Sequence, residues 1–291
     1  MLVSEKASGY AHASTHRLKA DEFTAGQTES QPAPADSFFA FPGGTLTGSC
    51  IHAIFENIDF SEPASSKNQL IITRLLQKFG LDDTGASKET TLPRAAIVQQ
   101  MTANVVQTAL LPDNPNFTLD RIPGRHRIPE LEFFYPVKRF TPGSLKAIFS
   151  GHTPPADPGA AVFREKIGRL EFRPVQGFMR GFIDLVFQFA GKYYLLDWKT
   201  NHLGNRYADY APEILTKSMA QALYNLQYYI YTVALHKYLE SRIPDYAYDR
   251  HFGGVFYLFV RGIHPDHPGT GIFYDRPQSG LVTALSNLFG L

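Results

Sequence analysis

The stretch GFIDLVFQFAGKYYLLDWKT, residues 181–200, decides the fold of this 291-residue chain. Two mostly apolar segments flank an Ala-Gly pair at 190–191, a pattern typical of two antiparallel strands joined by a tight turn. Three charged residues interrupt the apolar segments: Asp184, Asp197 and Lys199. Because charged groups in buried strands are costly unless they are paired or bound, the stretch predicts a hairpin that carries a polar site.

The spacing of these charges indicates what the site could bind. Asp197 and Lys199 are two residues apart and share one face of a strand. A loop of two or four residues also places Asp184 opposite Asp197, whereas an odd loop would separate them. Carboxylates about 5 Å apart repel by roughly 3 kcal/mol at an effective dielectric of about 20, so they share a proton or a cation. Oxygen ligands suit Mg²⁺. The pattern is therefore that of a metal-dependent phosphodiester hydrolase or of a structural salt-bridge set.

The composition is that of a globular protein with a real core. Hydrophobic residues make up 44% of the chain and the formal net charge is +1, so any DNA site must be a local groove. The single cysteine, Cys50, excludes a disulfide framework within the chain and is expected in the core. No signal peptide and no apolar run near 18 residues is present, which predicts a cytoplasmic protein without a membrane partner.

The expected elements give a mixed α/β architecture. Residues 1–37 are polar and rich in Ser, Ala, Thr and Pro, and are expected to form a flexible linker or tail before a domain over 38–291. The patterns predict helices over 45–60, 64–82, 88–111, 141–151, 212–240 and 279–289, a Pro/Gly-rich connection over 151–168, and strands over 130–140, 181–200, 253–262 and 271–275. The fold class is thus a central mixed sheet flanked by helices, with a helical N-terminal part.

Several segments resemble the RecB-type nuclease family of the PD-(D/E)XK superfamily. Ile183-Asp184 stands in place of Pro-Asp, and Asp197-Trp198-Lys199 forms the D-x-K. The segments GSCIHAIFENIDF, ELEFFYPV, YNLQYYIYTVALHKYL and YDRHFGGVFYLFVRGIHPDHPGTGIF resemble, in family order, its His helix, Glu strand, Q-x-x-x-Y helix and C-terminal strand and loop. The resemblance implies a restriction-endonuclease-like core over 38–291. No Walker A motif is present, so the chain resembles a C-terminal nuclease domain without the helicase.

The resemblance also implies a metal centre. Asp184 and Asp197 would bind the metal, together with His52 and the backbone carbonyl of Trp198. Lys199 would be the catalytic lysine near the scissile phosphate. The implied cofactor is Mg²⁺, and the histidine nitrogen suits Mn²⁺ as well, so both ions are expected to be accepted.

Further residues are expected around this centre. The resemblance makes Glu132, in preference to Glu130, a third acid near the metal. Gln227 and Tyr231 lie one turn apart on a helix and would contact the phosphate backbone or the bases. A basic run over 121–127 is either a solvated loop or a DNA-backbone contact, and the HPDHP segment at 264–268 is expected to form a turn rather than a second metal site.

The function that the resemblance implies is that of an exonuclease V-type, Mg²⁺-dependent exodeoxyribonuclease acting in double-strand break repair and recombination. Its implied partners are DNA, the subunits RecC and RecD, and the recombinase RecA. Two alternatives stay open: a non-catalytic docking module for RecA or RecC, and a stand-alone RecB-like nuclease for single strands.

Overall fold

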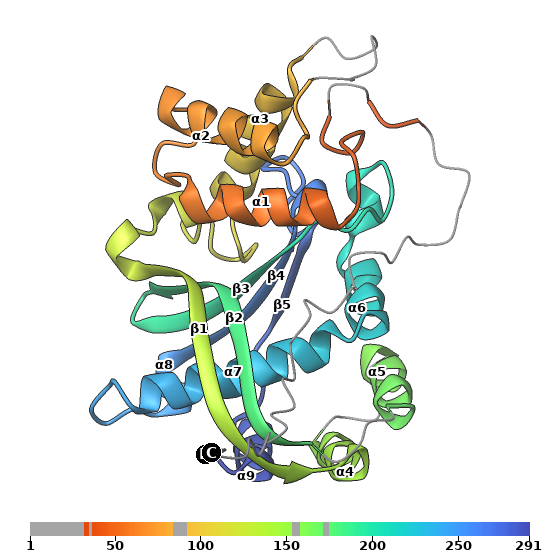
Figure 1. Ribbon diagram of the computed structural model, residues 1–291, viewed down its shortest axis with the longest axis vertical. Helices are drawn as coiled ribbons and strands as arrows, with labels where there is room; N and C mark the ends of the chain where they lie inside the picture. The colour runs from red at the N-terminus through yellow and green to blue at the C-terminus, as the bar shows by residue number, and fades with distance from the viewer. Residues whose placement is uncertain (1–31, 35–36, 84–91, 153–157, 171–174) are drawn as a thin grey trace, which may run out of the picture.

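The structure is a computed structural model that describes residues 32–34, 37–83, 92–152, 158–170 and 175–291. The expected linker or tail over 1–37 therefore lies almost entirely outside the described residues. The described part forms one mixed sheet with helices on both faces (Figure 1), which confirms the expected α/β class. None of its helices combines the length and the apolar character that crossing a membrane requires.

The sheet has five strands in the order β1-β2-β3-β4-β5. These are β1 (Arg127–Phe140), β2 (Val175–Phe189), β3 (Lys192–Lys199), β4 (Phe252–Phe259) and β5 (Ile272–Asp275). Strands β3 and β4 run parallel and all other neighbours are antiparallel. The long strands β1 and β2 extend beyond the rest of the sheet as a two-stranded ribbon, visible at the front of Figure 1.

The hairpin of β2 and β3 has the expected register. Phe189 is paired with Lys192, and the turn residues Ala190 and Gly191 have φ angles of 48° and 78°. Two consecutive positive φ angles are typical of a type I′ turn, whose twist matches that of the flanking strands. The last pair of this ladder is Leu185 with Leu196, one residue from Asp184, so that Asp184 lies at the point where β2 separates from β3.

Helices cover the two faces of the sheet and enclose two apolar clusters. On one face lie α1 (Thr45–Asn57), α2 (Ser66–Lys78) and α3 (Arg94–Gln107); on the other lie α4 (Pro142–His152), α5 (Pro158–Gly168), α6 (Pro212–Gln221), α7 (Tyr224–Glu240) and α9 (Ser279–Phe289), while α8 (Tyr248–His251) precedes β4. The α1 cluster comprises the buried apolar residues of α1–α3 with Leu185, Leu196 and Trp198. The α7 cluster comprises those of α4–α7 and α9 with Ile183, Leu195 and Tyr257.

Three expected elements differ from the structure. The connection expected over 151–168 contains helix α5, which begins at Pro158, a residue favoured at the first helical position. The single helix expected over 212–240 is two helices, because Leu223 adopts a left-handed conformation with φ of 58° and ends the regular hydrogen-bond ladder. The strand expected over 253–262 ends at Phe259 and continues as a short 3₁₀ turn.

Candidate active site

The packing of one aromatic pair fixes α1 over the hairpin. The Trp198 ring of β3 stacks on Phe55 of α1, with centroids 3.9 Å apart and an angle of 10°, and Phe60 meets it edge-on. Because Trp198 and Phe55 are both buried, this contact positions the helix against the sheet. His52 lies three residues before Phe55 and so faces the same side of α1, above Asp184.

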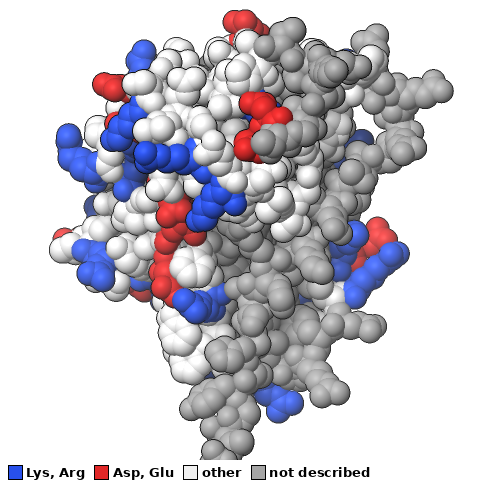
Figure 2. Space-filling model, turned by 45° about the horizontal axis from the view of Figure 1, so that its top comes forward, with Lys and Arg blue, Asp and Glu red and all other residues white. Residues whose placement is uncertain are grey.

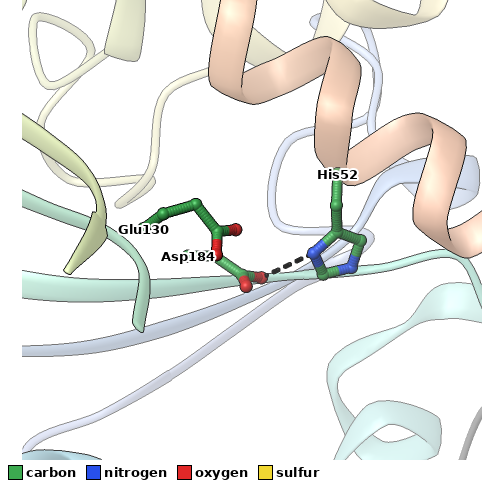
Figure 3. Close-up of side chains that lie close together, drawn as sticks. All are labelled: His52, Glu130 and Asp184. Atoms are coloured by element: carbon green, nitrogen blue, oxygen red, sulfur yellow. Dashed lines mark ion pairs between the residues drawn. The ribbon is translucent and has the colours of Figure 1, made fainter. Parts of the chain in front are cut away.

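Three potential metal ligands converge next to this contact. His52, Glu130 and Asp184 each offer one ligand atom, and these atoms all lie within 4.8 Å of one another. Figure 3 shows that the three side chains reach the same point from α1, β1 and β2. His52 Nδ1 lies 3.1 Å from Asp184 Oδ2. One imidazole nitrogen with carboxylate oxygens is a donor set that suits Mn²⁺ and Mg²⁺.

The two acids of this group lie at one irregularity of the ribbon. Glu130 follows Pro129 in the β1–β2 register and so lies opposite Asp184, and its φ angle is 47°, in the left-handed region. Such a conformation costs about 1–3 kcal/mol in a non-glycine residue and is concentrated at functional sites. In a regular strand, Ile183 and Leu185 would point to the same face of the sheet. Instead, Ile183 belongs to the α7 cluster and Leu185 to the α1 cluster, so the alternation of side chains along β2 is interrupted at Asp184.

Glu132, the acid that the sequence analysis preferred, lies elsewhere. Its carboxylate is 47% exposed and accepts a hydrogen bond of 2.6 Å from Arg180 Nε. Its partner across the ladder is Phe182, whereas Glu130 is opposite Asp184. The geometry therefore favours Glu130 over Glu132 as the third acid, contrary to the sequence-based preference.

The two glutamates provide a matched test of this correction. We expect Glu130→Gln to weaken Mn²⁺ binding by about 10–100-fold, the range found when a group that supports a metal site is removed. Glu132→Gln should leave the affinity nearly unchanged, because its carboxylate is occupied by an exposed arginine. Calorimetric titration with Mn²⁺ measures both. Equal losses in the two variants would contradict the assignment.

The lysine of the D-x-K segment is held by three groups. Lys199 Nζ lies 2.6 Å from Asp197 Oδ1 and donates a 3.3 Å hydrogen bond to Gln227 Oε1. It also lies 4.0 Å from the centroid of the Tyr224 ring, a cation–π contact. The side chains of Lys199 and Asp197 are only 7% and 4% exposed. The ammonium group is therefore fixed beside Asp197, and it is close enough to Asp184 to help lower the pKa of that carboxyl group.

Gln227 makes its contacts with the protein itself. Its Oε1 also accepts a 3.0 Å hydrogen bond from the hydroxyl of Tyr257, and its Nε2 donates one of 3.1 Å to the hydroxyl of Tyr231. Both ends of the amide are thus engaged, and one of them holds Lys199. These contacts favour a role for Gln227 and Tyr231 in positioning Lys199, beside the DNA contact expected from the sequence.

The buried charges shift one another's pKa values. Burial and the negative charge of Asp184 raise the pKa of Asp197 to about 6, although Lys199 acts in the opposite direction. Burial would also raise the pKa of Asp184, but the charge of His52 and a 2.9 Å hydrogen bond from the Trp198 N–H outweigh it, so this pKa lies below its ordinary value. Burial would lower the pKa of Lys199, yet Asp197 raises it above its usual range.

The residues therefore fit a divalent cation. Glu130, Asp184 and Asp197 bring three carboxyl groups to the site, and the groups of opposite charge are Lys199 and, when protonated, His52. Burial and, after it, the negative charge of Asp184 raise the pKa of Asp197, so the ionised form of this carboxyl group is destabilised. A divalent cation would stabilise that ionised form.

Three other segments from the sequence analysis have simpler roles. In the basic run, Arg121 and Arg125 are exposed, while Arg127 opens β1 with its guanidinium 4.1 Å from the Phe60 ring centroid. The HPDHP segment forms a turn, as expected, in which the Asp266 N–H donates to His264 Nδ1. Cys50 is buried, and burial raises its pKa to about 11, so it is an unreactive core residue.

A mixed five-stranded sheet flanked by helices, with an acidic cluster between α1, β1 and β2, defines an α/β protein with a PD-(D/E)XK-type core. No family model matches the chain. Among curated proteins it is 34% identical over 249 residues to the RecBCD enzyme subunit RecB of Escherichia coli K12, and 37% over 254 residues to that of Haemophilus influenzae Rd. The RecB subunit of Mycobacterium tuberculosis H37Rv is 34% identical over 272 residues.

These matches cover 85–86% of this chain and 19–24% of the relatives. The chain is therefore homologous to one part of RecB, as the order of its motifs predicts. It spans about a fifth to a quarter of the length of the curated RecB subunits that it matches.

Proposed function

We propose that the chain is the Mg²⁺-dependent nuclease domain of a RecBCD-type helicase–nuclease and hydrolyses phosphodiester bonds of DNA. The observation that carries this proposal is the convergence of His52, Glu130 and Asp184 beside the buried pair of Asp197 and Lys199. Homology to RecB over most of the chain supports the same function. An exonuclease V-type activity on DNA ends is part of the proposal.

The metal would be held by the groups that the hairpin and α1 bring together. Of the proposed ligands, His52, Asp184 and Glu130 lie in the three-ligand group, where Glu130 takes the place expected for Glu132. Asp197 and the backbone carbonyl of Trp198 lie outside that group and complete the set proposed from the family resemblance. When bound, the cation polarises the phosphate and lowers the pKa of water. Mg²⁺ is the proposed ion, and the imidazole nitrogen also admits Mn²⁺.

Lys199 contributes a fixed positive charge. Because its pKa is raised, Lys199 stays protonated at neutral pH and does not act as a general base. An immobilised ammonium next to the acids stabilises the negative charge that develops on the phosphate oxygens in the transition state. Gln227 and Tyr257 keep this group in place. The lysine is thus an electrostatic catalyst that is oriented before the substrate arrives.

The wider biological setting is proposed from the relatives, which are named as subunits of the RecBCD enzyme. In such an assembly the partners of this domain would be RecC and RecD, with RecA as a further contact. Its role would be DNA degradation in double-strand break repair and recombination, in the cytoplasm.

The decisive experiment is cleavage of labelled single-stranded DNA with Mg²⁺, Mn²⁺ or EDTA, comparing the chain with Asp197→Ala. We expect cleavage that needs the metal and disappears in the variant. Asp266→Ala is the matched control, because this carboxylate lies in the HPDHP turn and its side chain is 85% exposed. Cleavage that persists in EDTA or in Asp197→Ala would contradict the proposal. Absence of both cleavage and metal binding would favour a docking module for RecA or RecC.

Metal binding is expected to depend on pH through Asp197. A metal binds the ionised carboxylate, so protonation competes with it, and the pKa of Asp197 is about 6 instead of the ordinary 3.8. Below pH 6 the apparent affinity for Mn²⁺ should therefore fall by about tenfold per pH unit through this group alone. Calorimetric titrations between pH 5 and 7 measure the slope. Asp197→Asn should remove this component, and an unchanged slope in that variant would contradict it.

A further inference from the structure

Three phenylalanines are exposed on one face of the β1–β2 ribbon. Phe134, Phe178 and Phe182 are 57%, 49% and 42% exposed. Phe134 is paired across the ladder with Arg180, which lies between the two phenylalanines of β2 and on their face. We call these four residues the phenylalanine face. The opposite face of the ribbon packs on α7, which lies behind it in Figure 1.

The side chains of this face already display flat aromatic surfaces. The rings of Phe134 and Phe178 stack with centroids 4.7 Å apart and an angle of 7°. The Arg180 guanidinium lies 5.5 Å from the centroid of the Phe182 ring and forms an ion pair with Glu132. A group of exposed large apolar side chains on a soluble protein usually marks an interaction site.

The phenylalanine face continues directly into the candidate active site. Ile183 packs in the α7 cluster, so Phe182 points to the opposite side of the sheet, the side that α1 covers. Asp184, two residues after Phe182, contacts His52 of α1 on that side. Asp184 lies six positions after Phe178 along β2, a path of about 20 Å at the usual rise of a strand.

We propose that the phenylalanine face binds the bases of a single-stranded nucleic acid and leads the strand to the candidate active site. This inference rests on the proposed function and adds a binding surface to it. Aromatic rings stack on any base, because every base has a π face, and the contact carries no sequence preference. A duplex keeps its bases stacked inside, so the face selects single strands.

Two observations favour a nucleic acid over a protein as the occupant. The apolar side chains of the face are all aromatic, and its arginine, which is paired with Glu132 on the same face, can stack on a base or pair with a phosphate. In addition, Figure 2, which turns the top of Figure 1 toward the viewer, shows Lys and Arg side chains on either side of a short strip of Asp and Glu side chains. Basic side chains of this kind can pair with the phosphates of a strand whose bases stack on the rings.

Binding of oligonucleotides in EDTA tests this inference apart from cleavage. The probes are labelled dT12 and an abasic strand of the same length, which has the phosphates but no bases. The chain should bind dT12 more tightly than the abasic strand. Phe134→Ala, Phe178→Ala and Phe182→Ala should each weaken dT12 binding by about 5–150-fold, the range for loss of one stacked base, and should hardly change binding of the abasic strand.

Control variants separate stacking from folding defects. Leu70→Ala removes a 51% exposed apolar side chain on α2 and should leave both affinities unchanged. Phe182→Trp keeps an aromatic ring and should keep dT12 binding. Since Trp198 is the only tryptophan of the chain and is buried, the new indole should also report stacking by a loss of fluorescence when dT12 is added.

The outcomes distinguish this inference from the proposed function. Base-dependent binding that is lost in the alanine variants supports the phenylalanine face, whether or not cleavage occurs. Absence of cleavage in such an experiment would count only against the proposed nuclease function. Normal cleavage with an unchanged KM in a variant that carries Phe134→Ala, Phe178→Ala and Phe182→Ala together would overturn only the phenylalanine face. Equal binding of dT12 and the abasic strand would also overturn the proposal of a base-binding face. The same holds if the alanine variants keep dT12 binding but no longer form a complex with a protein.

Discussion

Asp184→Asn is expected to slow cleavage of single-stranded DNA by more than about a thousandfold, equivalent to about 4 kcal/mol of activation free energy. Asp184 lies in the three-ligand group with His52 and Glu130, and its Oδ2 also accepts a hydrogen bond from the Trp198 N–H. Asparagine has the same shape and keeps an acceptor for that N–H. The substitution therefore removes the negative charge with little change of packing.

Single-turnover rates with Mg²⁺ measure this effect directly. Calorimetry with Mn²⁺ should show a parallel loss of affinity, because the amide is a much weaker metal ligand than the carboxylate. Asp249→Asn is the matched control, because its carboxylate is 74% exposed, lies 3.5 Å from Arg276 and has no part in the proposed chemistry. A rate within tenfold of the unchanged chain in Asp184→Asn would contradict the proposed metal site.

The hairpin could be predicted from the sequence because its determinants are local. The Ala-Gly turn at 190–191 and the alternation of the two strands fix the register, and the register confirms the expected pairing of Phe189 with Lys192. The ion pair of Asp197 and Lys199 follows from their spacing of two residues on one strand. Each of these features needs only the geometry of neighbouring residues.

The choice between Glu130 and Glu132 could not be predicted in the same way. Ideal alternation places both residues on one face of β1, so the pattern does not separate them. The left-handed φ angle of Glu130 and the change of alternation at Asp184 arise from the pairing of the two strands. Neither residue type signals such an irregularity. The position of Glu130 directly after Pro129 is only a weak sequence signal for an irregularity in the strand.

The position of His52 also depends on a contact between distant segments. An isolated histidine in a helix has no sequence signal for a metal site, and the family resemblance was its sole support. In the structure, the stack of Phe55 on Trp198 fixes which side of α1 faces Asp184. Packing of side chains that are far apart in the chain is thus what completes the site. The same limit explains the break at Leu223, whose residue type gives no warning of a left-handed conformation.

A buried arginine ties the segment before α1 to the end of β3. Arg261 is 2% exposed, and its guanidinium donates to the carbonyls of Phe38, Phe41 and Pro42. Its Nε donates a 2.9 Å hydrogen bond to the carbonyl of Thr200, the residue after Lys199. One side chain therefore satisfies buried backbone groups from two distant segments, and both segments lead into the candidate site.

Arg261→Met is expected to lower the free energy of unfolding by about 3–5 kcal/mol, because each buried carbonyl that loses its partner costs about 1–3 kcal/mol and water can reach only some of them. Arg261→Lys should lower the free energy of unfolding by a smaller amount than Arg261→Met, since an ammonium group cannot donate to both segments at once. Urea unfolding measures these losses. Arg169→Met is the control, because this arginine, which directly follows α5, is 76% exposed and pairs with Glu165 of that helix, and an exposed ion pair contributes little. If Arg261→Met unfolds at the same urea concentration as Arg169→Met, the guanidinium does not hold the two segments together, and the position of α1 above Asp184 must depend on the packing of the α1 cluster.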